Sequence, residues 1–166
     1  SHNLGIAFRQ LRQWTEAERA AEQAVRHADQ LADAALRGLA LVGLAELHLE
    51  LKAWPLAERE IDRAATLAAE GEDPIGVVEA ARLHALLEFG MGNADAALRS
   101  ALAARSEARN LGSALLEAEC ATVAARAARQ LGREEEAGQL REEAEAGLTR
   151  LGAAGLLERF RNDWGA

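Results

Sequence analysis

The chain nearly repeats itself at a distance of 40 residues. Residues 11–25 read LRQWTEAERAAEQAV and residues 51–65 read LKAWPLAEREIDRAA, so that Trp14 falls on Trp54 and Ala17 on Ala57. The same pattern returns more weakly after moves of 79 and 120 positions from the first copy. A period of this size indicates an array of similar units that stack on one another, because a single unit cannot bury its own apolar face.

Each unit is predicted to be a pair of helices joined by a tight turn. The first helix carries bulky apolar residues at helical spacing. The second carries small residues at i, i+4 and i+7, such as Ala17, Ala21 and Ala24, a stripe that lets two helix axes approach closely. Turns are expected at 11–14, 51–54, 90–93 and 131–134. In the third unit the stripe is placed on Ala96, Ser100 and Ala103, and in the fourth on Ala137, Arg141 and Ala144. The expected helices span 2–11, 14–29, 33–51, 54–70, 74–89, 93–108, 112–130, 133–150 and 153–163.

The composition predicts an all-α chain. It contains 40 Ala and 26 Leu but only 8 Val and Ile together, and Ala and Leu favour helices whereas β-branched residues favour strands. We expect one domain over 1–166, with repeats at about 1–30, 33–70, 74–108 and 112–150 and a final helix at about 153–163. Because the chain begins Ser1-His2-Asn3 inside a helical pattern, it is expected to be a piece of a larger protein.

Charge and cysteine content restrict the function classes. The net charge is −8 and Lys52 is the single lysine, so neither nucleic acid nor an anionic membrane surface is an expected partner. A lone cysteine, Cys120, excludes a disulfide framework within the chain and suits the cytoplasm. The sequence has no apolar run of membrane-spanning length and does not open with a signal peptide.

Two short motifs resemble the tetratricopeptide repeat. Leu4-Gly5-x2-Phe8 is similar to the L-G-x2-Y core of that family, and Ala17-x3-Ala21 is similar to its second-helix signature. The period near 40, instead of 34, resembles the long repeats at the C-terminal end of large bacterial LuxR-type transcription regulators, such as the maltose-regulon activator. The resemblance implies a right-handed α-α superhelix, or solenoid, of four TPR-like helical hairpins followed by a C-terminal capping helix.

No catalytic motif accompanies the repeats. Lys52 has no glycine-rich phosphate loop before it, and neither H-E-x-x-H nor G-x-S-x-G occurs. His84 and Glu88 lie one helical turn apart, but two ligands fall short of a zinc site, so packing or partial exposure is expected for His84 and for His48. Cys120, close to Glu117 and Glu119, is predicted to be structural because a reactive thiolate requires nearby positive charge. The chain is therefore expected to be non-enzymatic, with no cofactor and no metal.

Three aromatic positions have both a structural and an adhesive interpretation. Trp14 and Trp54 recur in phase, which favours a role in plugging the inter-helix turn over a role as partner anchors. In the segment LLERFRNDW, 156–164, the apolar side chains form one stripe that ends with Trp164. That stripe predicts a cap on the last unit, and the alternative is a contact surface for another subunit or domain.

By the resemblance, ligand contacts fall on the face of each first helix that is turned away from the second helix. Leu49 and Phe89 would then be apolar anchors among acidic groups, and Arg126 and Arg129 a basic end. The alternative is a set of solvated residues with no partner. The expected groove residues are Ile6, Arg9, Gln10, Val42, Glu46, Leu49, Glu50, Ala85, Glu88, Phe89, Arg126, Arg129 and Gln130.

The function expected from these features is a cytoplasmic protein-interaction module within a bacterial signalling or transcriptional regulator. Its partner would be a peptide or protein segment in the concave groove. One alternative is a sensor of a small effector. Another is a self-association arm that forms homo-oligomers through the N-terminal edge or the C-terminal helix.

Overall fold

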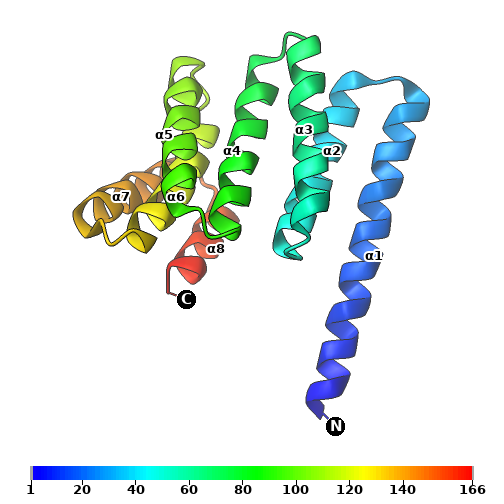
Figure 1. Ribbon diagram of the computed structural model, residues 1–166, viewed down its shortest axis with the longest axis horizontal. Coiled ribbons are helices and arrows are strands. Elements are labelled where there is room, and N and C mark those ends of the chain that lie inside the picture. The colour runs from blue at the N-terminus through cyan, green and yellow to red at the C-terminus, as the bar shows by residue number, and fades with distance from the viewer. Residues whose placement is uncertain (1, 166) are drawn as a thin grey trace.

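The computed structural model describes the backbone of residues 2–165 and the side chains of residues 12–165. Within these residues the chain forms eight helices and no strand, which confirms the all-α class (Figure 1). None of these helices combines the length and the apolarity needed to cross a membrane. The helices are α1 His2–Leu31, α2 Ala34–Glu50, α3 Trp54–Glu70, α4 Pro74–Gly90, α5 Ala94–Asn110, α6 Ala114–Gln130, α7 Glu134–Arg150 and α8 Ala154–Gly165.

Consecutive helices pack against each other along the whole chain, and α4 also contacts α2 on one side and α6 on the other. The helices therefore follow one another across the molecule (Figure 1). Small side chains fill the contacts between them: Ala57, Ala97 and Ala137, spaced 40 residues apart, are all completely buried. An alanine at the contact lets two helix axes approach closely, as the sequence predicted.

The turns recur every 20 residues, which is half of the sequence period. After each of α1 to α7 one residue adopts a left-handed backbone conformation, and the next residue closes a six-residue hydrogen-bonded cap on the helix. After α4, for example, the N–H of Gly92 donates to the carbonyl of Phe89 at 3.1 Å and that of Asn93 to Glu88 at 2.8 Å. The left-handed residues are Ala32, Lys52, Glu72, Gly92, Gly112, Gly132 and Gly152.

Two of the helix starts show how local sequence fixes the boundaries. The Asp73 carboxylate accepts a hydrogen bond from the N–H of Gly76 at 3.0 Å, and Pro74 occupies the first helical position. An aspartate followed by proline is typical of the start of a helix. Asp33 caps α2 in the same way, accepting from the N–H of Leu36 at 2.9 Å.

The predicted turn at 11–14 is wrong, because α1 runs unbroken from His2 to Leu31. Arg12 would be the left-handed residue of that turn, and a non-glycine residue there costs about 1–2 kcal/mol. A separate helix of about ten residues would bury little surface in return. Among the described side chains of α1, Val25 and Ala28 are buried against the array, and Glu18 Oε1 lies 3.2 Å from His48 Nε2 of α2.

Two further expectations change with this result. Ala17 is exposed, although its counterpart Ala57 is completely buried, because no helix covers that part of α1. Likewise Trp14, at 37% exposure, plugs no turn. The Trp54 ring packs on Gly90, the last residue of α4, and not on the turn of its own unit.

The stripe predicted for the third unit is one residue out of register. Ala97, Ala101 and Ala104 are buried, whereas Ala96 and Ser100 are only partly covered. The third copy of the pattern therefore lies 80 positions after the first copy, and not 79. The error came from aligning the apolar residues of α4 instead of the turns, which keep a strict spacing.

The C-terminal segment forms the expected helix and packs on the last pair of helices. Phe160 of α8 is 3% exposed and joins the apolar cluster that contains Ala124 and Ala137, with Trp164 packed beside it. The Phe160 and Trp164 rings meet edge to face, with their centroids 5.9 Å apart. The start of α8 at residue 154 follows the same 20-residue spacing as the other helices.

Candidate functional site

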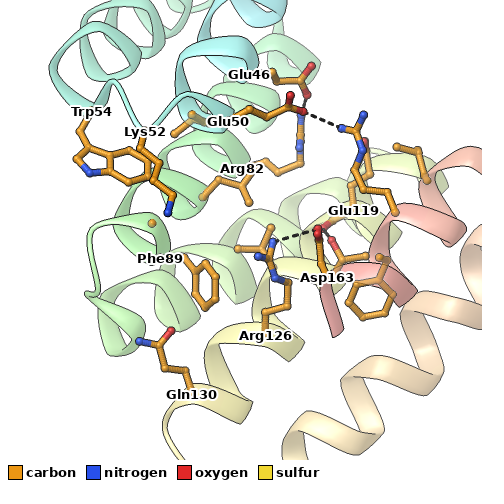
Figure 2. Close-up of a pocket in the computed structure, with 18 of the residues that line it drawn as sticks. Glu46, Glu50, Lys52, Trp54, Arg82, Phe89, Glu119, Arg126, Gln130 and Asp163 are labelled. Atoms are coloured by element: carbon orange, nitrogen blue, oxygen red, sulfur yellow. Dashed lines mark hydrogen bonds and ion pairs between the residues drawn. The ribbon is translucent and has the colours of Figure 1, made fainter. Parts of the chain in front are cut away.

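A groove of about 670 Å³ lies between the even-numbered helices (Figure 2). Its walls come from α2, α4, α6 and α8, with single contributions from α3, from α7 and from the turns after α2 and α4. The lining is mixed, with apolar side chains among charged ones of both signs. The residues are Glu46, Leu49, Glu50, Lys52, Trp54, Arg82, Leu86, Phe89, Gly90, Gly92, Glu119, Thr122, Val123, Arg126, Gln130, Leu148, Leu156, Arg159, Phe160 and Asp163.

The groove brings together about half of the residues expected to form it. Those that line it are Glu46, Leu49, Glu50, Phe89, Arg126 and Gln130. The side chains of Ile6, Arg9 and Gln10 lie outside the described residues. Val42 is half-buried against the core and is not part of the lining.

Three expected residues are engaged elsewhere. Ala85 is completely buried in the core. Glu88 lies beside His84, with its Oε1 atom 3.7 Å from Nδ1 of that ring. Arg129 is held by Trp164, with its guanidinium 4.8 Å from the ring centroid and a hydrogen bond to the Trp164 carbonyl.

Several lining residues were not expected from the sequence, among them Arg82, Leu86, Glu119 and Arg159. The strict 40-residue period would have found some of them, because Leu86 stands midway between Glu46 and Arg126, and Arg82 is the counterpart of Val42. The period also relates Glu119 to Arg159. No such signal reveals that α8 faces α2 across the groove, because this arrangement depends on the packing of all the helices between them.

Arg82 is a buried cation in the groove wall. Its side chain is 6% exposed, and Nη2 donates to Glu46 at 2.8 Å and to Glu79 at 2.7 Å. Burial by itself lowers the pKa of Arg82, but the hydrogen bonds and charge of Glu79, with the nearby Glu119 and Glu46, raise it above its usual value. The guanidinium is therefore permanently charged, and its two hydrogen-bonded carboxylates hold it in place.

Ion pairs connect α8 to the opposite walls. Arg159 of α8 lies 3.3 Å from Glu50 of α2, and Asp163 lies 3.7 Å from Arg126 of α6 (Figure 2). The Arg126 guanidinium also stacks over the Phe89 ring, 4.6 Å from its centroid. Both ion pairs are partly exposed to solvent, so each contributes little to stability, but together they place α8 along one side of the groove.

Glu119 is the half-buried carboxylate of the groove. Burial raises its pKa above the usual value, an effect that Arg82 partly offsets and that Glu79 and Glu46 reinforce. Its backbone carbonyl accepts a hydrogen bond from the Thr122 hydroxyl at 2.7 Å. Its carboxylate forms no hydrogen bond and no close ion pair with any described side chain.

The remaining candidates for chemistry are Cys120 and the His84–Glu88 pair, and their surroundings do not favour a reactive role. Cys120 is buried, and burial raises the pKa of its thiol to about 12, so the thiolate needed for nucleophilic chemistry is scarce. Among the described residues, no three His, Cys, Asp or Glu side chains converge on one point. The His84–Glu88 pair accordingly has no third ligand within that part of the chain.

The described chain is an all-helical, repeat-like protein whose even-numbered helices form a groove of mixed polarity. Comparison with known proteins finds no matching family model and no matching curated protein.

Proposed function

We propose that this chain is a non-enzymatic protein-interaction module that holds a short peptide or protein segment in the groove between its even-numbered helices. The observation that carries this proposal is the lining: apolar side chains from four helices stand beside charged groups that face a common space. Peptide segments are recognised in this way, with apolar anchors for affinity and polar groups for register.

The wider setting is also part of the proposal. The 40-residue period, the alternation of helices and the buried alanines support a tetratricopeptide-like array wound as a right-handed superhelix. The resemblance places such an array in a cytoplasmic bacterial signalling or transcriptional regulator, where it would supply a partner contact to other domains. The helix arrangement supports the repeat character of the proposal.

A display selection tests the proposal. Random seven-residue peptides are selected on the wild-type chain, and the enriched peptides are then measured against the double variant Leu49→Asp/Phe89→Asp. The matched control is Leu39→Asp/Ile75→Asp, because these residues are exposed, lie on the same two helices and stay outside the groove. Circular dichroism first establishes that both variants are folded.

We expect the control to bind the enriched peptides like the wild type and the groove variant to bind them at least about tenfold more weakly. Enrichment of no peptide, or equal binding by the groove variant, would overturn the proposal.

A second candidate is a sensor that binds a small effector in the same groove. The observation in its favour is the volume of about 670 Å³, which lies within the range of about 300–1,000 Å³ typical of small-ligand sites. Thermal shifts across a metabolite library test this candidate, because a compound that binds only the folded chain raises the melting temperature. A compound that shifts the wild type but not Leu49→Asp/Phe89→Asp would favour the sensor.

A further inference from the structure

The charged groups of the groove are unequally satisfied by the chain itself. Arg82 is bonded to two carboxylates, Glu50 is paired with Arg159, and Arg126 with Asp163. The carboxylate of Glu119 has no such partner among the described side chains, although it is half-buried. Most of the charged groups in the groove are therefore already paired before an occupant binds, whereas the carboxylate of Glu119 is not.

A carboxylate in this position attracts a cation. Removal from water penalises its charged form, and a donor that arrives with positive charge would offset the penalty. Arg82 offsets this penalty only in part, because its guanidinium is held by Glu46 and Glu79, and both of these carboxylates add negative charge near Glu119.

The surroundings of Glu119 suit the stem of a long cationic side chain. Leu86, Val123 and Phe160 line the same groove, and an aliphatic stem lies favourably on such apolar surface while its charged end reaches a polar partner. Figure 2 shows Glu119 beside Asp163 on one side of the groove, whereas Lys52 and Trp54 lie on the opposite side. The cation of an occupant would thus enter on the α6–α8 side, away from the lysine.

We propose that the groove selects an arginine or lysine side chain within an otherwise apolar peptide segment, and that Glu119 is the carboxylate that pairs with the cation. This proposal rests on the proposed function, because it specifies the occupant of the same groove. A guanidinium can form two parallel hydrogen bonds with a carboxylate, so arginine is expected to bind more tightly than lysine.

The test uses two capped pentapeptides, acetyl-Leu-Leu-Arg-Leu-Leu-amide and the same peptide with citrulline in place of arginine. Citrulline keeps the length and shape of arginine but carries no charge. Binding is followed by titration calorimetry and by amide NMR shifts at Leu86, Thr122 and Val123. The protein variants are Glu119→Gln and, as the control on the same helix, Glu117→Gln, whose wild-type carboxylate pairs with Arg109 outside the groove.

We expect the wild type and Glu117→Gln to bind the arginine peptide at least about tenfold more tightly than the citrulline peptide. Glu119→Gln should bind the two peptides equally. Equal binding by the wild type, or a preference for arginine that survives in Glu119→Gln, would overturn the pairing with Glu119 while leaving the groove as a peptide site.

Two other outcomes also decide the matter. Absence of binding by the arginine peptide at millimolar concentration would overturn the cationic preference, and the display selection would decide separately whether the groove takes any peptide. Free agmatine, which carries the same guanidinium, is the last arm. If agmatine binds as tightly as the peptide, the cation belongs to a small effector and the peptide proposal is wrong.

Discussion

The indole ring of Trp54 lies directly against Gly90, at the junction of α3 with the end of α4. A Cβ atom on residue 90 would stand 2.6 Å from Cη2 of that ring, which is closer than van der Waals contact allows. The first residue of one helix thus requires the absence of a side chain at the last residue of the next. Both residues of this contact also line the groove.

Gly90→Ala should therefore destabilise the chain by about 1–3 kcal/mol, the usual cost of overpacking. Gly43→Ala is the matched control, since a Cβ at residue 43 meets no atom within 4 Å. That variant should be more stable by about 0.5–1 kcal/mol because alanine favours the helix. Denaturant melts of the two variants measure both values, and an equal effect of the two substitutions would contradict the packing described here.

A second prediction compares two alanines that occupy the same place in the repeat. Ala57→Trp should destabilise the chain by at least about 1–3 kcal/mol, because residue 57 is completely buried between helices. Ala17→Trp should change the free energy of unfolding by no more than about 0.5 kcal/mol, since residue 17 is exposed on α1. A large loss of stability in Ala17→Trp would indicate that another helix covers this part of α1 in solution.

A third prediction concerns the pH dependence of stability. Burial raises the pKa of Glu119 in the folded chain, so the unfolded chain loses this proton first. Stability is then lost as the pH rises from the unfolded pKa, about 4.3, through the folded one. Glu119→Gln, which resembles the neutral carboxyl group, should raise the melting temperature at pH 7 and have little effect below about pH 4. Glu117→Gln serves as the control. A lower melting temperature for Glu119→Gln at pH 7 would show that the charge of Glu119 is compensated in the folded chain.

A fourth prediction concerns the reactivity of Cys120. With a pKa of about 12 and complete burial, this thiol should resist iodoacetamide at pH 8 in the native chain. In urea it should react at the rate of an ordinary exposed cysteine. Mass spectrometry of the alkylated protein over time makes the comparison. Complete labelling within minutes under native conditions would show that α6 opens readily.

The last prediction tests how α8 is attached. Phe160→Ala removes the one buried side chain of that helix, and deletion of a buried phenylalanine costs about 3–5 kcal/mol where the site remains folded. Because α8 packs at the end of the array, we expect the loss to appear as local opening. Hydrogen exchange should accelerate in α8 and leave α2–α5 unchanged, while the exposed-site control Glu158→Ala should behave like the wild type. Acceleration throughout the chain would show that α8 stabilises the whole array.

The candidate groove was predictable from the sequence only in part. Leu49 and Phe89 were found because they recur at one helical position 40 residues apart, whereas Ala85 was misplaced by one step around the helix from Leu86, the counterpart of Glu46. Arg129 keeps the helical position of Phe89 but is held by Trp164 of α8. A shift of one residue turns a side chain by about 100°, so a small error in register exchanges a groove residue for a buried one. Arg159 was not foreseen, since its pairing with Glu50 joins residues at opposite ends of the chain.

The sequence by itself determined the helical class, the period and nearly every helix boundary, because these depend on neighbouring residues. Alanine and leucine favour helices, while features such as Asp73-Pro74 and Gly112 begin or end them within a few residues. Only the tertiary structure decided that α1 continues through residue 12 and that α8 lies across the groove from α2. Both results depend on surface that is buried between segments far apart in the sequence.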